Sequence, residues 1–429
     1  MDRTKLALLD AINPTKIEED LEVFAAMSSG PIGVNRLAYS DLERRSHKYF
    51  LEYMTGLGLP CWTDTAGNSL AEYSSDTNKE SACLATGSHL DSVPDGGRYD
   101  GIVGVVASME IARILSEEKV SLRKPWRFIV FAAEEGARFG QACNGSRAIA
   151  GLATPQTLEK SIDKDGVSLA KAMKKVGFNP DLIEESKWAI GECEGFIELH
   201  IEQGNVLESA STSVGIVDVI SGSQRLLVTV VGEAAHSGGT PMNLRCDALL
   251  TASKAIVALD VYSRDSKNTG IRITVGRITV LPGSITTVPG WVEFTVDIRD
   301  FKAERQSRVL EEISEILRQA SDENGTALEI KQIGEINPIE LNPQMVGTIQ
   351  KTSQNLNLKT MVLASGASHD CQNMGRITAS GLIFVPSISG HSHMPSEFSS
   401  IESIVAGAKL LFASLLELDQ TIAFKIGED

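Results

Sequence analysis

The sequence predicts an α/β fold in two parts: a mixed, mostly parallel sheet with helices on both faces, and an inserted α+β domain. Short apolar segments alternate with amphipathic helical segments towards both ends of the chain, as in sheets that are buried on both faces. Between these regions apolar and polar residues alternate, as in antiparallel strands with one exposed face. At 429 residues the chain also exceeds what one hydrophobic core usually supports.

The first part of the chain starts with two expected helices, at residues 15–28 and 39–57. Apolar runs of strand length then predict three buried strands, at 82–88, 126–133 and 196–201. Between the first two strands, GIVGVVASMEIARIL (101–115) carries an apolar stripe at helical spacing. This alternation of strands with helices favours a parallel sheet.

The middle of the chain has the alternating pattern of half-exposed strands. These strands are expected at 224–234, 269–280 and 290–300, with helices at 243–262 and 303–322. The first pattern then returns as a helix at 341–356, a buried strand at 381–387 and a helix at 401–418. The simplest arrangement is one domain formed by residues 1–212 and 334–429, interrupted by an inserted domain of residues 213–333.

Composition excludes several classes of function. Forty Lys and Arg residues against fifty-six Asp and Glu give a net charge of -16, which disfavours nucleic acid or an anionic membrane as a partner. The six cysteines show no CxxC spacing, which indicates reduced thiols. The first residues turn acidic before any apolar stretch of signal-peptide length, and no segment approaches the roughly 20 apolar residues of a membrane span. We therefore expect a cytoplasmic protein.

The segment GSHLDSVPDGGRYDG (87–101) ends the first buried strand and carries candidate metal ligands. Ligand sites of open α/β sheets lie at the carboxyl ends of strands. At a spacing of two residues, Asp91 can hydrogen-bond the imidazole of His89 and support it as a ligand. Asp100 precedes the predicted helix, where a helix N-cap is the alternative to a metal ligand.

Three more strand ends carry polar residues of the same kind. Glu134 and Glu135 are adjacent in FAAEEGARFG, and two like charges there are costly unless a cation neutralises them or one carboxyl keeps its proton. ELHIEQG carries His200 and Gln203, and SGHSHMPSEF carries two histidines. A lone histidine at a strand end is more often structural, but four such segments favour a site. Histidine and carboxylate ligands without nearby cysteine suit zinc or manganese, and a shared carboxylate is typical of hydrolytic sites with two ions.

Six ordered segments resemble one known family. They are GSHLDSVPDGGRYDG, FAAEEGARFG, ELHIEQG, HSGGTPMNLRCDAL, SGASHD and VPSISGHSHMPSE. Together they resemble the carbamoylase and hydantoinase branch of the M20 metallopeptidase-like amidohydrolases, over nearly the whole chain. The resemblance implies a catalytic domain with a dinuclear metal site and an inserted domain that serves as a lid and for dimerisation.

The resemblance also implies roles for the candidate ligands. Asp100 would bridge two divalent ions per subunit, of which one is also bound by His89 and His200 and the other by Glu135 and His393. The ions would be zinc or manganese, with cobalt or nickel also accepted. Glu134 matches the general base of the family, and Asp91 matches a catalytic residue that supports the site.

In the inserted domain, His236 matches a family residue that polarises the scissile carbonyl, often from the partner subunit of a homodimer. Arg299 matches the arginine that pairs with the substrate carboxylate, and Gln203 in the larger domain matches a residue beside the substrate. Thr286 stands where the family usually carries an asparagine, and it lacks the paired donor and acceptor of an amide. This departure concerns the identity of the substrate and leaves hydrolysis as the expected reaction.

The expected function is hydrolysis of the carbamoyl C–N bond of an N-carbamoyl-L-amino acid or N-carbamoyl-β-alanine, releasing the amino acid, ammonia and carbon dioxide. Allantoate or ureidoglycolate is the alternative small carboxylate substrate, followed by an N-acyl amino acid or dipeptide. A metal-bound binding protein without catalysis is disfavoured, because such a protein has no need of Glu134 beside Glu135.

Overall fold

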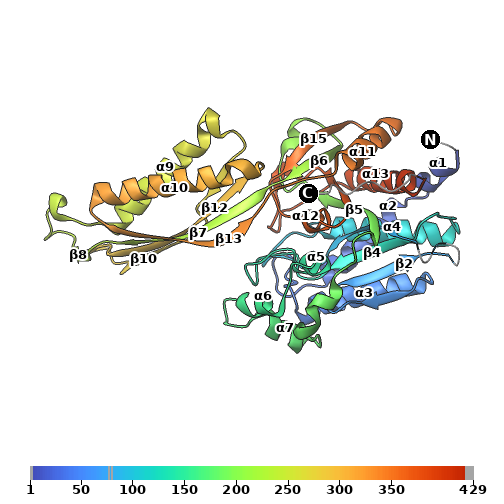
Figure 1. Ribbon diagram of the computed structural model, residues 1–429, viewed down its shortest axis with the longest axis horizontal. Helices are drawn as coiled ribbons and strands as arrows, with labels where there is room; N and C mark the ends of the chain where they lie inside the picture. Colours follow the sequence, from blue (N-terminus) through green and yellow to red (C-terminus); the bar gives the residue numbers. More distant parts are fainter. Residues whose placement is uncertain (1–2, 76–77, 79–80, 421–429) are drawn as a thin grey trace. The chain divides into compact units, whose positions relative to one another are not determined.

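The computed structural model describes residues 3–75, 78 and 81–420, which form two compact units. Unit 1 takes in the chain up to Asp218 and again from Glu340, and unit 2 is Val219–Ile339. Both boundaries fall a few residues beyond those expected from the sequence. Strand β6 (Val214–Ile220) belongs to the sheet of unit 1, and strand β13 (Ala327–Ile336) belongs to the sheet of unit 2 before β14 (Ile339–Glu340) returns to unit 1. The two units are shown in Figure 1.

Unit 1 is built on a nine-stranded sheet of order β1-β2-β4-β3-β5-β16-β6-β14, with β15 paired to β6. Its four central strands are parallel to one another: β3 (Cys83–His89), β4 (Trp126–Phe131), β5 (Cys193–Ile201) and β16 (Ala379–Val385). The outer strands β2 and β6 run antiparallel to this centre. The remaining strands are β1 (Cys61–Thr63), β2 (Ser69–Tyr73) and β15 (Thr360–Ser365). This mixed sheet confirms the predicted fold class.

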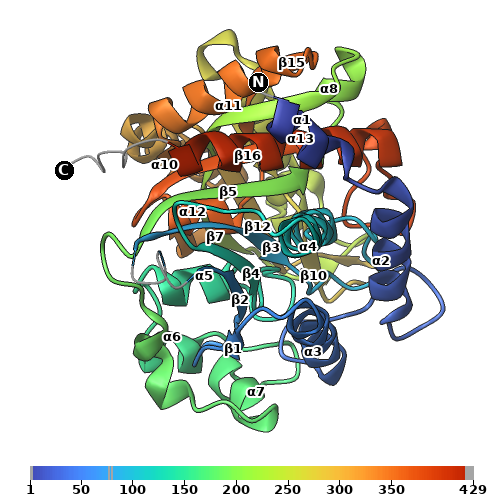
Figure 2. The same cartoon turned by 90° about the vertical axis from the view of Figure 1, so that its right-hand side faces the viewer.

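Helices cover both faces of this sheet (Figure 2). Leu199 of β5 faces α4 (Ile102–Glu117) and α13 (Ile401–Gln420), whereas the neighbouring Glu198 faces α12 (Asp370–Met374). The other long helices are α1 (Arg3–Asp10), α2 (Pro14–Ala26), α3 (Asp41–Gly56) and α11 (Pro343–Asn355). Shorter helices are α5 (Asn144–Ile149), α6 (Pro155–Lys160), α7 (Leu169–Lys175) and α8 (Val206–Ser209). Every residue of β3 and β16 is buried, because both faces of the sheet are covered there.

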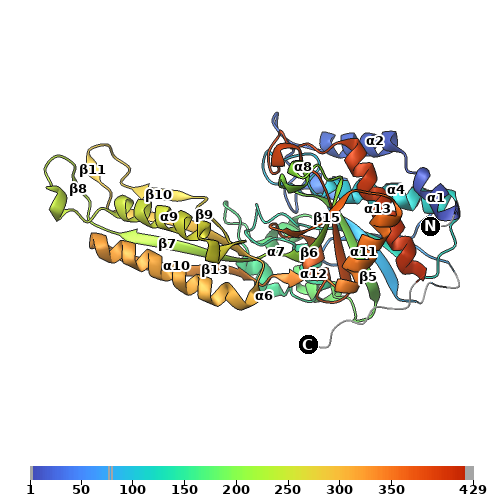
Figure 3. The same cartoon turned by 90° about the horizontal axis from the view of Figure 1, so that it is seen from above.

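Unit 2 is a five-stranded antiparallel sheet with two helices packed on one face (Figure 3). The strands are β7 (Gly222–Val231), β9 (Arg272–Thr274), β10 (Ile278–Leu281), β12 (Trp291–Asp300) and β13 (Ala327–Ile336). The helices are α9 (Ala248–Arg264) and α10 (Ala303–Asn324). Every second residue of β12 is buried against these helices, which explains the alternation in the sequence. A small two-stranded sheet pairs β8 (Ala235–His236) with β11 (Thr287–Val288).

Within the described part of the chain, none of the helices has the length and apolar character that crossing a membrane requires.

Candidate functional site

The four central strands of unit 1 deliver the predicted ligands to one edge of the sheet. His89 is the last residue of β3, His200 lies near the end of β5, and Glu134 and Glu135 follow β4. His393 lies in the loop after β16. Because the four strands are parallel, their carboxyl ends meet at the same edge.

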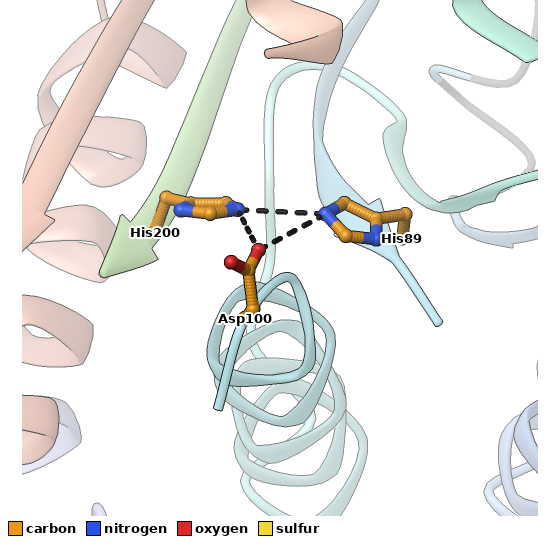
Figure 4. Close-up of side chains that lie close together, drawn as sticks. All are labelled: His89, Asp100 and His200. Atoms are coloured by element: carbon orange, nitrogen blue, oxygen red, sulfur yellow. Dashed lines mark hydrogen bonds and ion pairs between the residues drawn. The ribbon is translucent and has the colours of Figure 1, made fainter. Parts of the chain in front are cut away.

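His89, Asp100 and His200 form a buried cluster (Figure 4). Asp100 Oδ1 lies 3.6 Å from His89 Nε2 and 3.2 Å from His200 Nε2, and the two Nε2 atoms are 3.5 Å apart. Gly101, just before helix α4, allows this approach: its φ is 72°, and a Cβ there would lie 2.5 Å from the His89 ring. Asp100 therefore faces two imidazoles with one of its oxygens.

The other oxygen of Asp100 belongs to a second cluster. His393 Nε2 lies 3.4 Å from Asp100 Oδ2 and 3.4 Å from Glu135 Oε1. Gln203 Nε2 donates to the same Asp100 oxygen at 2.6 Å, and Ser392 Oγ donates to it at 2.8 Å. The two oxygens of one carboxylate thus face two separate sets of ligand atoms.

The hydrogen bonds of the imidazoles indicate that a cation fits the first cluster. His89 Nδ1 contacts the carbonyl oxygen of Asp91 at 3.2 Å, and His200 Nδ1 contacts that of Ile201 at 2.9 Å. A carbonyl oxygen only accepts, so each Nδ1 carries a proton, which leaves Nε2 as the atom of each ring that can bind a metal ion. The two Nε2 atoms face one carboxylate oxygen, an arrangement that suits a divalent metal ion. The nitrogen and oxygen donors suit zinc or manganese.

Asp91 supports the site in a way that the sequence did not predict. Its carboxylate accepts the backbone N–H groups of Glu134 and Glu135, each at 2.9 Å. The distance from Asp91 Oδ1 to His89 Nδ1 is 3.6 Å, and it is the backbone oxygen of Asp91 that accepts from the ring. One buried carboxylate thereby fixes the backbone of both glutamates.

Glu134 and Glu135 occupy different electrostatic surroundings. Burial raises the pKa of Glu134 well above its usual range, against the lowering effect of His89, and the charge of Glu135 adds to the rise. The Cys143 thiol donates to Glu134 Oε1 at 2.9 Å, and Oε2 lies 3.6 Å from His89 Nε2. Burial and the neighbouring Asp100 raise the pKa of Glu135 to about 7. A cation at the Asp100 cluster would relieve this repulsion.

Asp100 itself stays ionised. Burial alone would raise the pKa of Asp100, but the facing His200, His393 and His89 hold it well below its usual range. A carboxylate with two charged oxygens can contact two cations at once, whereas a helix N-cap uses only one oxygen for the backbone.

Glu397 was not singled out from the sequence, although it ends the SHMPSE pattern. Its carboxylate accepts the backbone N–H groups of Tyr99, Asp100 and His393, at 2.9, 3.0 and 3.3 Å. Gly97 makes room for it, because a Cβ at that position would lie 2.0 Å from the Glu397 side chain. Glu397 therefore ties the loop of Asp100 to the loop of His393.

Two of the predicted substrate residues lie together in unit 2. His236 of β8 pairs with Thr287 of β11, next to Thr286, and the carbonyl oxygen of Thr286 accepts from Ser237 N at 2.9 Å. His236 Nδ1 accepts from the backbone N–H groups of Gly238 and Gly239 at 3.1 and 2.9 Å. The Nε2 atom of a neutral His236 therefore carries the proton and can donate it in a hydrogen bond.

Arg299 lies at the other end of the same unit. Strand β12 runs ten residues from Trp291, beside β11, to Asp300 next to Arg299. At roughly 3.3 Å per residue, the eight steps from Trp291 to Arg299 span about 26 Å, and His236 lies at the Trp291 end. Arg299 Nε donates to Asp297 Oδ2 at 2.8 Å, and its Nη1 is buried without a hydrogen-bond partner among the described residues. Within a single chain, His236 and Arg299 of unit 2 therefore cannot contact the same small substrate.

Comparison with known proteins gives a consistent assignment. Residues 85–417 match the model of peptidase family M20/M25/M40. The chain is 37% identical over 389 residues to the N-carbamoyl-L-amino acid amidohydrolase of Geobacillus stearothermophilus, covering 90% of this chain and 94% of that protein. It is 31% identical over 418 residues to the allantoate amidohydrolase of Bacillus subtilis, covering 97% and 100% of the two chains.

A solved structure has the same fold over nearly the whole chain. The amidase of the hydantoinase/carbamoylase family from Burkholderia multivorans superimposes with a TM-score of 0.83 at 29% identity, covering 95% of this chain and 98% of that one. The segments that carry the ligand clusters lie within these matches. The chain therefore belongs to peptidase family M20/M25/M40, in the carbamoylase and hydantoinase branch of its amidohydrolases.

Proposed function

We propose that the chain hydrolyses the carbamoyl C–N bond of an N-carbamoyl-L-amino acid or N-carbamoyl-β-alanine. The observation that carries the proposal is the Asp100 carboxylate, whose two oxygens face two separate sets of ligand atoms. A carboxylate shared by two ions is typical of hydrolytic metal sites. The similarity to proteins named N-carbamoyl-L-amino-acid amidohydrolase, at 33% to 37% identity, supports the class of substrate.

Two divalent ions fit the two clusters. His89 and His200 would hold one together with Asp100, and Glu135 and His393 would hold the other. When bound, such ions polarise an amide carbonyl and lower the pKa of water. Zinc, manganese, cobalt and nickel all accept these ligands.

Glu134 moves the proton in this proposal. Asp91 fixes its backbone, Cys143 holds one of its oxygens, and burial raises the pKa of its carboxyl group. Such a carboxylate can take a proton from the attacking water and return it to the leaving nitrogen. The water oxygen bonds to the carbamoyl carbon, the bond from that carbon to the amino acid nitrogen breaks, and the carbamic acid product decays to ammonia and carbon dioxide.

Unit 2 recognises the substrate. The Nε2–H of His236 would donate to the carbonyl oxygen as negative charge develops on it. The guanidinium of Arg299 offers paired donors to a substrate carboxylate, and its unpartnered Nη1 supports this role.

The chain would act as a homodimer. Because about 26 Å of strand lies between Arg299 and the end of β12 near His236, one small substrate cannot contact both residues of the same chain. A second copy would supply His236 and Thr286 to the site. Helix α9 offers an apolar surface for this association, since Leu250, Val257 and Val261 are exposed along it.

Allantoate or ureidoglycolate is the second candidate substrate. The observation in its favour is the similarity to proteins named for these substrates, at 30% to 31% identity. Thr286 in place of the family asparagine removes an amide near His236, where a difference between substrates would be read.

Ammonia release tests the proposal. The protein loaded with manganese or with zinc is incubated with carbamoyl amino acids, carbamoyl-β-alanine, allantoate and ureidoglycolate. We expect the highest kcat/KM for a carbamoyl amino acid or carbamoyl-β-alanine, with equal yields of amine and ammonia. Turnover of allantoate alone would select the second candidate, and no ammonia from any of the four would refute both.

A further inference from the structure

The face of the unit 2 sheet opposite its helices carries an excess of positive charge near the end of β12. Arg225, Arg272 and Arg299 project from three neighbouring strands around one carboxylate, that of Asp297. Asp297 accepts from Arg225 Nε at 3.0 Å and from Arg299 Nε at 2.8 Å. Both of its oxygens are therefore already used by two of the three arginines.

Arg272 is the arginine without a carboxylate. In the antiparallel pair of β9 and β12 it lies directly opposite Arg299, so both side chains project from the same face. Like charges in directly opposite positions destabilise a sheet. Arg272 has no ion pair among the described residues, and its guanidinium lies over the ring of Phe301, 5.6 Å from the ring centre. This stacking leaves the charge of the guanidinium without a carboxylate.

Arg277 shows that the same face does supply carboxylates to other arginines. Its Nη2 lies 3.1 Å from Glu293 Oε1, also on β12. Glu293, Asp297 and Arg299 alternate along one face of that strand. Among the described residues, Arg272 is thus the arginine of this group without a carboxylate, and Nη1 of the opposite Arg299 is buried without a hydrogen-bond partner.

We propose that Arg272 binds a second carboxylate of the substrate, next to the one bound by Arg299. The preferred substrate is then the carbamoyl derivative of an amino acid with an acidic side chain. This inference rests on the proposed function and narrows its substrate class. Two adjacent guanidinium groups with free donors match a ligand with two carboxylates, since each carboxylate accepts charge-assisted hydrogen bonds.

The test compares acidic substrates with neutral ones of the same shape. The pairs are N-carbamoyl-L-glutamate with N-carbamoyl-L-glutamine, and N-carbamoyl-L-aspartate with N-carbamoyl-L-asparagine. We expect kcat/KM of the wild type to be about 10-fold or more higher for the acidic member of at least one pair, as one charge-assisted hydrogen bond supplies. Arg272→Gln should reduce that ratio to about 1 and leave the neutral substrate within about twofold of the wild type.

Arg277→Gln is the matched control, because it removes a guanidinium from the same sheet whose charge is already paired. Its acidic-to-neutral ratio should equal that of the wild type. The inference is overturned if the acidic-to-neutral ratio of kcat/KM is near 1 for both pairs in the wild type, or if it is unchanged in Arg272→Gln. Hydrolysis of the neutral substrates would in that case still support the proposed function. A dimer that dissociates in Arg272→Gln with the ratio unchanged assigns Arg272 to the subunit interface and also overturns it. No ammonia from any of the four substrates, with allantoate hydrolysed, removes the proposed function itself.

Discussion

The two units support their candidate residues in different ways. In unit 1, His89, Asp100 and His200 are buried, and the carboxylates of Asp91 and Glu397 accept buried backbone hydrogen bonds that fix the loops around them. In unit 2, His236 and Thr286 are exposed on short segments, and Arg299 is half-buried on the sheet face opposite the helices. Buried polar groups tolerate little change because each lost partner is costly. Exposed residues can change without loss of the fold. Under the proposed function, the chemistry is therefore held in unit 1 and the choice of substrate can vary in unit 2.

Removal of Asp100 should have the largest effect. Asp100→Ala takes a ligand from both clusters, whereas Glu135→Ala takes a ligand from one. We expect the Asp100 variant to retain fewer metal ions per chain than the Glu135 variant, and to have no measurable ammonia release. Metal analysis after dialysis checks this, and two ions per chain in Asp100→Ala would refute a bridging role.

Glu134 should affect turnover and leave metal binding intact. Glu134→Gln preserves the shape and the contact with Cys143 but removes the base, so kcat should fall by a factor on the order of 10² or more. Metal content and KM should stay within about twofold of the wild type. Near-normal turnover at full metal content would show that another group moves the proton.

In unit 2, Arg299→Ala should lower kcat/KM by about 10- to 100-fold, since one side of an arginine–carboxylate pair is removed at a partly exposed site. Metal content should not change. Arg299→Lys should recover only part of the loss, because an ammonium has no planar pair of donors. The control is a substrate whose carboxylate is replaced by an amide: if the variant loses the same factor on it, Arg299 serves the structure of unit 2 instead of the substrate.

The smallest expected effect is the change in stability when the metal ions are removed. Without ions, burial and Asp100 raise the pKa of folded Glu135 from 4.5 to about 7. A raised pKa means that the folded state binds this proton more tightly than the unfolded chain. The stabilisation is fully present below about pH 4.5 and is lost as the pH rises through about 7.

Tm of the chelated protein should therefore fall between about pH 5 and pH 8 by a few degrees more than Tm of the loaded protein. Glu135→Gln should flatten this dependence in the chelated protein. If Tm of the loaded and of the chelated wild type fell equally over this pH range, the proton of Glu135 would not be the cause of the pH dependence.

Much of the fold was predictable because its signals are local. Short, mainly apolar runs predicted β3, β4, β5 and β16, and alternation predicted β7 and β12. Short edge elements such as β1 and helices α5 to α8 were missed, since a few residues carry too little periodicity. The first boundary was expected at residue 212, before β6, but β6 pairs with β16 and so belongs to the sheet of unit 1.

In the candidate site, too, the residues with local sequence signals were predictable and the long-range contacts were not. Residues at strand ends could be proposed from sequence order, since parallel strands bring their carboxyl ends together. The contacts of Asp91 and Glu397 with backbone N–H groups could not, because they join loops far apart in the chain: Glu397 reaches Asp100 across 297 positions. The pairing of Arg272 with Arg299 depends on strand register, which the sequence alone leaves open.

The most direct test of a two-ion amidohydrolase is a metal titration followed by two readouts. Metal-free protein receives increasing equivalents of manganese, and bound metal and ammonia release from an N-carbamoyl-L-amino acid are measured on the same samples. We predict that ammonia release rises until two ions are bound per chain and then stays constant. Full activity with one ion bound, or in the metal-free protein, would contradict a site in which Asp100 joins two metal ions.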